Sequence, residues 1–294
     1  METVVWKKPD LSGKAAVVTG ASRGGGKGIA LSLGEAGATV YVTGRSTRGS
    51  GSAADRNRET IEDTAEAVTA RGGLGIPVCC DHAVDAEVEA IFEQAKKEQG
   101  KLDLLVNNAW GGYEGYDDAD FQAPFWQQPL ARWDKMLTIG LRSTMVASRY
   151  AMSVFLPQRH GLIVNTTANV ELGEFHGSVF YDTVKKAIQR MTYGMGENLR
   201  THETGVSAVV LAPGWMRTEA VMRHFGMEPG DPDFLRVAAF SQTESVEYIG
   251  RAVASLADDP AVAVKSGQLL EVGDLAKEYG FTDVDGRQLS PFRI

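Results

Sequence analysis

The fold of this chain is decided near its start, where residues 15–30 read AAVVTGASRGGGKGIA. The small and β-branched residues that open this stretch predict a buried strand, and the residues from Gly26 onward favour a helix. The glycines between them allow a sharp turn that brings the backbone close to a pyrophosphate, and the helix N-terminus offers free N–H groups. A flexible turn without a ligand is the plainer interpretation, but a strand before it and a helix after it are the context of a dinucleotide site.

Short β-branched runs alternate with helical stretches along the rest of the chain. We expect strands at residues 15–19, 39–43, 74–80, 102–107, 161–166, 206–211 and 268–272. We expect helices at residues 26–37, 55–71, 86–99, 130–156, 180–201 and 243–257, the long fourth helix being ended by Pro157. This alternation predicts an α/β fold in which a doubly wound parallel sheet of about seven strands, a Rossmann fold, forms a three-layer αβα sandwich.

The 294 residues contain no linker rich in proline, glycine and serine at mid-chain and no repeat of 20–50 residues. We therefore expect one domain over residues 1–294, with insertions near residues 111–128 and 215–242. The hydrophobic content of 43% and the charged content of 23% exclude a disordered, fibrous or coiled-coil protein.

Charge and composition also exclude several classes of partner. The net charge of −8 argues against a nucleic-acid-binding protein, which normally carries a basic surface. No apolar run reaches the ~18 residues of a membrane span, and the first residues do not resemble a secretory signal. The adjacent Cys79 and Cys80 are expected to be two buried thiols in a reducing compartment, which favours the cytoplasm. The five scattered histidines show no metal-site spacing.

The residues after the second predicted strand indicate which dinucleotide binds. NAD sites place an acidic residue there to hold the ribose 2′-OH, whereas this strand ends in Thr43-Gly44-Arg45-Ser46. Arg23 lies inside the glycine turn, so two guanidinium groups are expected near one ribose. Because guanidinium groups suit a 2′-phosphate, we predict NADP(H) as the cofactor, the alternative being two ordinary surface arginines.

Tyr181 and Lys185 stand four residues apart on a predicted helix and therefore share one face. A nearby ammonium favours the phenolate and is expected to lower the pKa of Tyr181. Such a tyrosine can protonate a carbonyl oxygen or deprotonate an alcohol. Alone, this spacing more often describes a solvated helix face, but here it follows the fifth strand of a nucleotide-binding chain.

From about residue 11 to residue 272 the chain resembles the short-chain dehydrogenase/reductase family. The matching motifs are TGxxxGxG at residues 19–26, Asp81, NNA at residues 107–109, YxxxK at residues 181–185 and PGxxxT at residues 213–218. The resemblance implies that Asp81 and His82 border the adenine, and that residues 213–218 cover the nicotinamide. The candidate cofactor-binding residues are Gly20, Ser22, Arg23, Gly24, Gly25, Gly26, Arg45, Ser46, Asp81, His82, Asn107, Ala109, Tyr181, Lys185, Pro213, Gly214, Met216 and Thr218.

Three positions depart from the pattern of that family. Trp110 replaces a glycine after the NNA motif, and Gly140 replaces an asparagine that supports a water beside the lysine. Ala168 stands where the family has its catalytic serine, so we predict that Thr167, the nearest hydroxyl, holds the substrate carbonyl. Asn169 and Ser178 are the alternatives. Trp110, the segment at residues 140–142 and the ending TDVDGR at residues 282–287 resemble the member-1 subgroup of dehydrogenase/reductases.

We therefore expect an NADP(H)-dependent oxidoreductase that acts on a small-molecule carbonyl or secondary alcohol, with Tyr181, Lys185 and Thr167 as catalytic residues. Trp110 and Trp215 directly follow cofactor motifs and are expected to line an apolar substrate pocket. One alternative is an NADP-binding sensor or scaffold without turnover, and another is a lyase or epimerase on the same fold. The resemblance implies a homodimer or homotetramer packed through the long helices.

Overall fold

Seven parallel strands form one sheet in the order β3-β2-β1-β4-β5-β6-β7. The structure is a computed structural model that describes residues 5–49, 59–113, 121–171 and 173–293. The strands are β1 (Ala15–Val18), β2 (Thr39–Gly44), β3 (Leu74–Cys79), β4 (Leu104–Asn107), β5 (Gly161–Thr166), β6 (Val206–Ala212) and β7 (Leu269–Glu271). The predicted doubly wound α/β fold is thereby confirmed.

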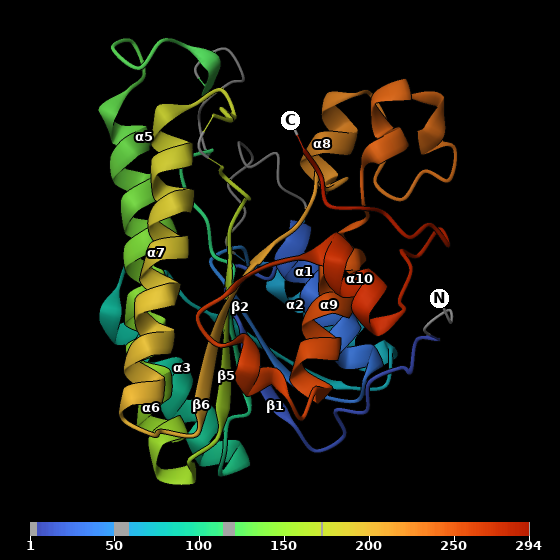
Figure 1. The fold of residues 1–294 in the computed structure, drawn as a ribbon. Coiled ribbons are helices and arrows are strands. Elements are labelled where there is room, and N and C mark those ends of the chain that lie inside the picture. Colours follow the sequence, from blue (N-terminus) through green and yellow to red (C-terminus); the bar gives the residue numbers. More distant parts are fainter. Residues whose placement is uncertain (1–4, 50–58, 114–120, 172, 294) are drawn as a thin grey trace.

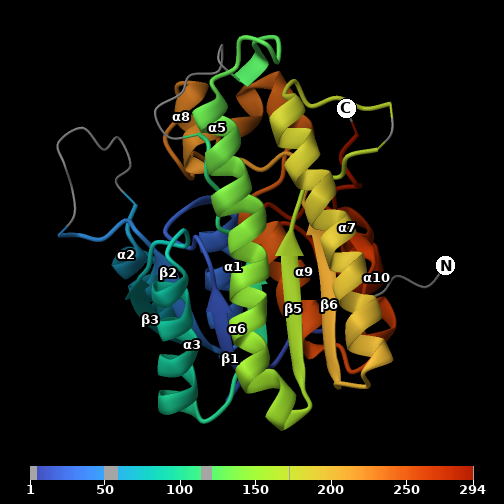
Figure 2. The ribbon, with the colours of Figure 1, turned by 90° about the vertical axis from the view of Figure 1, so that its left-hand side faces the viewer.

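Helices cover both faces of this sheet and complete the three layers (Figures 1 and 2). One face carries α1 (Gly24–Glu35), α2 (Ile61–Ala70), α9 (Val246–Asp258) and α10 (Val272–Tyr279). The other face carries α3 (Asp85–Gln99), α6 (Ser143–Gln158) and α7 (Val179–Thr201). The short helices α5 (Leu130–Lys135) and α8 (Glu219–His224) lie beyond the sheet, at the end where the strand arrows point (Figure 2).

The strands have an apolar core on each side because alternate residues point to opposite faces. Val18 and Val40 pack in the core beneath α1 and α9, whereas Val17 and Tyr41 pack in the core beneath α3 and α6. Both faces are buried, which is why these strands read as continuous apolar runs.

Helices α1 and α9 approach each other at two glycines. A Cβ atom built on Gly28 would overlap the carbonyl oxygen of Val246, and one built on Gly250 would overlap Ser32. A glycine at this position of the first helix suggests close packing of α1 on the sheet, but Gly28 permits close packing of α1 on α9 instead. Sequence periodicity does not distinguish these two neighbours, because both lie on the buried side of the helix.

The predicted long helix at residues 130–156 is three consecutive segments. A π-helical segment at Met136–Arg142 separates α5 from α6. The helix continues through Pro157 and ends after Gln158, where Arg159 adopts a left-handed conformation with φ of 53°. A proline in the last turn removes one backbone hydrogen bond and is tolerated there, so its role as the end point was wrongly predicted.

Three further expectations need correction or completion. Cys79 is exposed, so only Cys80 is a buried thiol, and burial raises the pKa of Cys80 to about 12. The region at residues 215–242 contains α8 and two short 3₁₀ segments at Phe234–Arg236 and Ala238–Gln242. Residues 55–58 of the predicted second helix and residues 114–120 of the predicted first insertion lie outside the described residues.

Candidate active site

The predicted cofactor motifs meet at the carboxyl ends of the strands, the upper end of the molecule in Figures 1 and 2. Thr19 follows β1, Asn107 ends β4, Thr167 follows β5 and Pro213 follows β6. Ligands of open parallel sheets bind at this end, near the point where the strand order reverses. The strand order reverses between β1 and β4, so the glycine turn and the NNA motif lie side by side.

The glycine turn packs directly against the NNA motif. Thr19 Oγ1 accepts hydrogen bonds from the backbone N–H groups of Asn108 at 2.9 Å and Ala109 at 3.0 Å. Gly20 has a φ of +64°, and a Cβ on it would lie 2.7 Å from the Cα of Ala109. Only glycine allows this contact, so Gly20 joins the two motifs rather than merely making the turn flexible.

The turn opens α1, whose first residues are Gly24, Gly25 and Gly26, all buried. Glu219 of α8 accepts a hydrogen bond from the Gly24 N–H at 2.8 Å, and it lies 3.5 Å from Lys27. Thr218 caps α8 by accepting from the N–H of Val221. The segment that begins α8 is therefore attached to the helix N-terminus that the fold offers to an anion.

A polar group gathers beside the end of β2. The Arg23 guanidinium donates to Ser46 Oγ and lies 3.4 Å through Nε from Ser22 Oγ. Arg45 lies 3.9 Å from Asp81, with more than half of its side chain exposed. The structure thus brings both predicted arginines and both predicted serines to one place, and it supplies cationic and hydroxyl donors there.

Asp81 and His82 have local structural contacts. Asp81 Oδ1 accepts from the N–H of Ala83 at 2.9 Å and so shapes the turn that leads into α3. His82 is buried, and its Nε2 lies 2.9 Å from Thr43 Oγ1. Burial lowers the pKa of His82 to about 4, so the ring is neutral at physiological pH.

Asn107 belongs to a buried amide network. Its Nδ2 donates to Ser148 Oγ at 3.0 Å and to Asn165 Oδ1 at 2.8 Å. Asn165 in turn donates to Thr192 Oγ1 at 2.9 Å. The network ties β4 and β5 to α6 and α7, which fixes the strand ends on which the site is built.

Tyr181 and Lys185 lie together on the first turns of α7, and aromatic rings surround them. The rings of Trp110 and Phe121 have centroids 5.5 Å and 5.7 Å from that of Tyr181. Lys185 Nζ lies 3.7 Å from the centre of the Trp110 indole, a cation–π contact. Aromatic side chains therefore surround the Tyr181–Lys185 pair.

Burial shifts the pKa values of Tyr181 and Lys185 in the directions that favour their neutral forms. The pKa of Lys185 falls to about 7 because its ammonium is removed from water. The pKa of Tyr181 rises well above its usual value, first because of burial and then because of Tyr113 and Asp182. The predicted lowering of the Tyr181 pKa is therefore wrong for this structure, since desolvation outweighs the nearby ammonium.

Trp110 also explains the glycine at position 140. A Cβ on Gly140 would lie 2.6 Å from Cζ3 and 2.8 Å from Cε3 of the indole. Gly140 lies within the π-helical segment, directly across from the ring. The departures from the family pattern at positions 110 and 140 therefore have one explanation, because the indole at position 110 leaves no space for a side chain at position 140.

We expect Gly140→Asn alone to lower the free energy of unfolding, because overpacking costs about 1–3 kcal/mol. The double variant Trp110→Gly with Gly140→Asn should recover part of that loss, since the amide then occupies the space of the ring. Urea denaturation of the two single variants and the double variant measures their coupling. Additive effects of the two substitutions would contradict the shared-space explanation.

The predicted orientation of Thr167 is wrong. Thr167 is buried, and its hydroxyl donates to the backbone carbonyl of Lys185 at 2.9 Å. Successive residues leaving a strand point to opposite sides, so the residue before Ala168 faces α7 rather than the substrate side. Thr167 therefore holds α7 against β5.

The two alternative donors are also engaged. Ser178 is buried, caps α7 at Tyr181 and donates to Gln128 Oε1 at 3.1 Å. Asn169 donates through Nδ2 to Glu271 at 3.1 Å, and its buried Oδ1 has no hydrogen-bond partner among the described residues. The Ser178 hydroxyl is therefore bound within the protein, whereas the Asn169 amide keeps a second N–H besides the one bonded to Glu271.

The Pro213–Thr218 segment is hydrogen-bonded to the residues that precede α9. Met216 pairs with Glu244 in a parallel bridge, and the Gly214 N–H donates to Glu244 Oε2 at 3.0 Å. Burial raises the pKa of Glu244 to about 8, so this carboxyl group is largely protonated at neutral pH. A Cβ on Gly214 would meet the same carboxylate oxygen at 2.8 Å, which accounts for the glycine.

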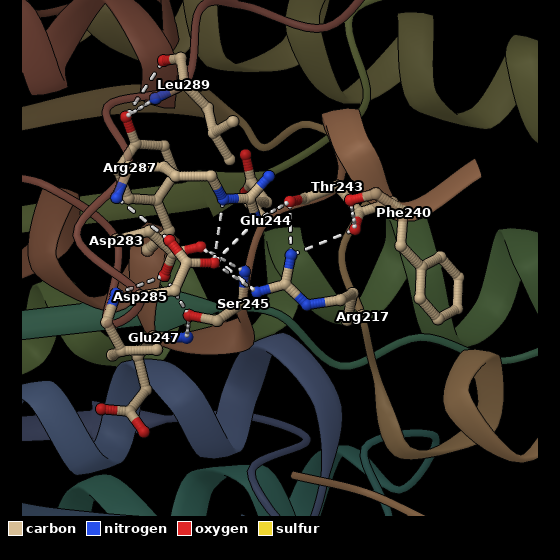
Figure 3. Close-up of polar contacts among 12 residues, drawn as sticks. Arg217, Phe240, Thr243, Glu244, Ser245, Glu247, Asp283, Asp285, Arg287 and Leu289 are labelled. Carbon is tan, nitrogen blue, oxygen red and sulfur yellow. Dashed lines mark hydrogen bonds and ion pairs between the residues drawn. The ribbon is translucent and has the colours of Figure 1, made fainter. Parts of the chain in front are cut away.

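A second set of contacts joins this segment to the C-terminal end of the chain (Figure 3). The Arg217 side chain is 6% exposed and lies 3.5 Å from Asp283 and 3.2 Å from Asp285. Asp283 also accepts from the Ser245 N–H at 2.7 Å. Arg287 donates to the Thr243 carbonyl at 2.9 Å. We call Arg217, Asp283, Asp285 and Arg287 the C-terminal clamp, because they bind residues 282–287 to the loop that flanks the site.

The two tryptophans predicted to line a pocket have different surroundings. Trp110 packs on Lys185 and Tyr181, as described above. Trp215 packs with Phe225 and Phe240, at centroid distances of 6.2 Å each, within the region around α8. The structure thus places Trp110 at the Tyr–Lys pair and Trp215 in an aromatic cluster around α8.

Sequence reasoning missed several residues near the site. The C-terminal clamp joins residues more than sixty positions apart, for which the sequence carries no signal. The sequence offers His176 only as a fallback for the acid–base role of Tyr181, and its pairing with Asp182 next to that tyrosine was missed. The position of Asp182, directly after the tyrosine and six residues after a histidine, is the only signal that could have found this pair.

Within the described part of the chain, no three histidine, cysteine, aspartate or glutamate side chains are placed to hold a metal ion. Over the same residues, no helix has the length and apolar character needed to cross a bilayer.

Comparison with known proteins identifies the family. The family model described as short chain dehydrogenase matches residues 14–228. The chain is a short-chain dehydrogenase. This short-chain dehydrogenase is 39% identical to dehydrogenase/reductase SDR family member 1 of Mus musculus over 96% of its own length and 87% of that protein. It is 32% identical to the D-beta-hydroxybutyrate dehydrogenase of Cupriavidus necator over 72% of its length and 74% of that enzyme.

Solved structures share the fold of this short-chain dehydrogenase. A putative dehydrogenase from Xanthomonas campestris has a TM-score of 0.75 and 26% identity, covering 96% of this chain and 97% of that one. A short chain dehydrogenase from Mycobacterium thermoresistibile has a TM-score of 0.78 over 96% of this chain and 95% of that one, at 22% identity. The predicted family is confirmed, and with it an oxidoreductase of alcohol or carbonyl substrates that uses a nicotinamide cofactor.

Proposed function

We propose that this short-chain dehydrogenase transfers a hydride between NADP(H) and a small-molecule carbonyl or secondary alcohol. The observation that carries the choice of NADP(H) is the group formed by Arg23, Ser46 and Arg45 at the end of β2. Residues 43–46 contain no carboxylate that would hold a ribose 2′-OH. A guanidinium group with a hydroxyl beside it suits the oxygens of a 2′-phosphate.

The remaining residues fit a dinucleotide. The glycines at the start of α1 leave the backbone bare where a pyrophosphate approaches, and the neighbouring Thr218 and Met216 lie within 4 Å of a Cβ built on Gly24 or Gly25. Lys185 is buried near the same strand ends, and its Nζ can donate to a ribose hydroxyl once the Trp110 indole that lies on it moves aside. When bound, the nicotinamide supplies or accepts the hydride.

Tyr181 is the proton donor and acceptor in this proposal, and Lys185 orients the ribose. The phenol is the natural donor because burial keeps it protonated until a substrate oxygen gains charge. Trp110 packs on Tyr181 and Lys185, and in this proposal Trp110 and Trp215 line an apolar substrate pocket. We also propose that the chain is one domain, since β7 completes the same sheet as β1, and that it works as a homodimer or homotetramer.

The cofactor preference is testable by substitution of Arg45. We expect Arg45→Asp to weaken NADPH binding and to narrow or reverse the preference over NADH, because a charged partner of the 2′-phosphate is replaced by a like charge. Loss of such a partner typically costs ~1.5–3 kcal/mol, and the exposure of Arg45 points to the lower end, about ten-fold in Kd. Isothermal titration with NADPH and NADH measures both affinities.

Arg48→Gln is the matched control, because Arg48 lies three residues further along and pairs with Asp63 and Glu66 of α2. Its loss should leave the NADPH affinity almost unchanged. Equal affinities for NADH and NADPH in the unmodified chain would refute the proposed preference.

A sensor or scaffold that binds NADP(H) without turnover is the second candidate. It is favoured by Ala168 together with the engaged hydroxyls of Thr167 and Ser178. The two functions separate in one assay, in which NADPH oxidation is followed across a panel of ketones and aldehydes. Slow oxidation with any of them supports the oxidoreductase, and tight NADPH binding without oxidation supports the sensor.

A further inference from the structure

In this protein the Trp110 indole covers the side of the Tyr181–Lys185 pair on which the family pattern places an asparagine and a water. The indole of Trp110 lies on Lys185 Nζ at 3.7 Å, and it fills the space of the asparagine that the family pattern places at position 140. Burial keeps the phenol of Tyr181 in its neutral form, so a phenolate left after proton donation is costly. The site therefore needs another path by which Tyr181 recovers its proton.

A histidine–carboxylate pair lies on another side of Tyr181. The His176 ring centroid is 5.9 Å from that of Tyr181, at an interplanar angle of 49°. His176 Nδ1 lies 3.0 Å from Asp182 Oδ1, and the backbone N–H of His176 donates to Asp182 Oδ2 at 3.1 Å. Both oxygens of the carboxylate thus lie beside one residue. The backbone hydrogen bond joins the two residues, while Nδ1 and Oδ1 are in contact without a hydrogen bond between them.

The pair connects the buried tyrosine to solvent. The His176 side chain is 18% exposed, and its Nδ1 atom is itself buried. The exposed part of the side chain is therefore on its other atoms, away from Asp182. The carboxylate 3.0 Å from Nδ1 favours a proton on that nitrogen, which leaves Nε2 to accept a proton and pass it on.

We infer that His176, held by Asp182, is the proton relay that returns a proton to Tyr181 during turnover. This inference rests on the proposed oxidoreductase function. Reduction of a ketone adds one hydride to the carbonyl carbon and one proton to the oxygen. Tyr181 donates that proton, the Nε2–H of His176 replaces it on the phenolate, and water replaces the proton on Nε2. In alcohol oxidation each proton moves in the opposite direction.

Other titratable side chains near the phenol are poorer relays. Lys185 is covered by the indole and has its pKa lowered to about 7 by burial. Tyr113 packs between Trp110 and Phe121 and is 52% exposed, but among the described residues it has no carboxylate beside it to orient its phenol. His176 is the neighbour that combines a carboxylate partner with partial exposure to water.

The experiment measures NADPH-dependent ketone reduction by His176→Ala, with and without added imidazole. We expect kcat to fall by about 10²-fold, with KM for the ketone and Kd for NADPH unchanged, because a proton donor and not a binding group is lost. Imidazole in the buffer should restore kcat in a concentration-dependent way. Asp182→Asn should lower kcat by about ten-fold, since the ring remains but loses its orienting partner.

Two control variants separate this role from a structural one. His202→Ala removes an exposed histidine at the other end of α7 and should not change kcat. Tyr113→Phe tests the neighbouring phenol and should retain turnover. An unchanged kcat in His176→Ala, a loss that imidazole does not restore, or a loss in Tyr113→Phe that a buffer acid restores would each overturn the inference.

A second measurement keeps the inference testable if the unmodified chain turns over no ketone, a result that counts against the proposed function alone. Nitrogen-15 NMR of the histidine rings should show the His176 Nδ1 carrying a proton, and this signal should change in Asp182→Asn but not in His202→Ala. A His176 whose Nδ1 is unprotonated and insensitive to Asp182→Asn would overturn the relay whatever the activity.

Discussion

Tyr181→Phe should bind NADPH as the unmodified protein does and lose about 10²–10⁴-fold in kcat. The substitution removes the hydroxyl that exchanges a proton with the substrate oxygen and leaves the ring in place. The contacts of that ring with Trp110 and Phe121 are made by carbon atoms, so the fold and the cofactor site should persist. Fluorescence titration with NADPH and steady-state kinetics on a reactive ketone measure the two properties separately.

Tyr193→Phe is the matched control, because Tyr193 is an exposed tyrosine twelve residues further along α7. Its kcat should equal that of the unmodified protein. If Tyr181→Phe retained a near-normal rate, the acid–base role would belong to another group, and the relay through His176 would have no phenol to serve.

Gly28→Ala should be strongly destabilising, because among the glycines of the described residues a Cβ on Gly28 makes the shortest contact with backbone. The added methyl would overlap the backbone carbonyl of Val246, which cannot move away by rotating a side chain. Overpacking typically costs about 1–3 kcal/mol, and overlap with backbone places this variant at or above the upper limit. Thermal denaturation and urea denaturation should both show the loss, because α1 and α9 must separate to admit the methyl group.

Gly194→Ala provides the comparison, since Gly194 lies inside α7 and a Cβ there meets no atom within 4 Å. This variant should gain about 0.5–1 kcal/mol, because alanine loses less conformational entropy than glycine in a helix. If Gly28→Ala and Gly194→Ala changed the free energy of unfolding equally, the contact between α1 and α9 would be looser than it is in the structure.

Much of the fold was predictable because a buried parallel strand is a continuous apolar run. The strands at residues 39–44 and 161–166 were located almost to the residue for this reason. The helix Val272–Tyr279 was missed because it begins directly after β7, without a turn to mark it. The π-helical segment was missed because its geometry depends on what packs across from it, which periodicity does not report.

The parts of the site that depend on short-range sequence spacing were predictable. Gly20 and the Tyr181–Lys185 pair stand at spacings set by a turn and by a helix, and both were found. The hydroxyl of Thr167 was predicted to face the substrate, but it faces α7. Side chains one residue apart along an extended segment point to opposite faces, so a shift of one residue reverses the predicted orientation. The departures at positions 110 and 140 were both visible in the sequence, but only the packed structure shows that each accounts for the other.

The shared space of Trp110 and Gly140 also bears on how this enzyme could be redesigned. A library that varies position 140 alone would sample mostly destabilised sequences, because any side chain there meets the indole, the Cβ lying 2.6 Å from the ring. The asparagine of the family pattern becomes accessible when positions 110 and 140 are varied together, so the two positions form one unit for protein engineering.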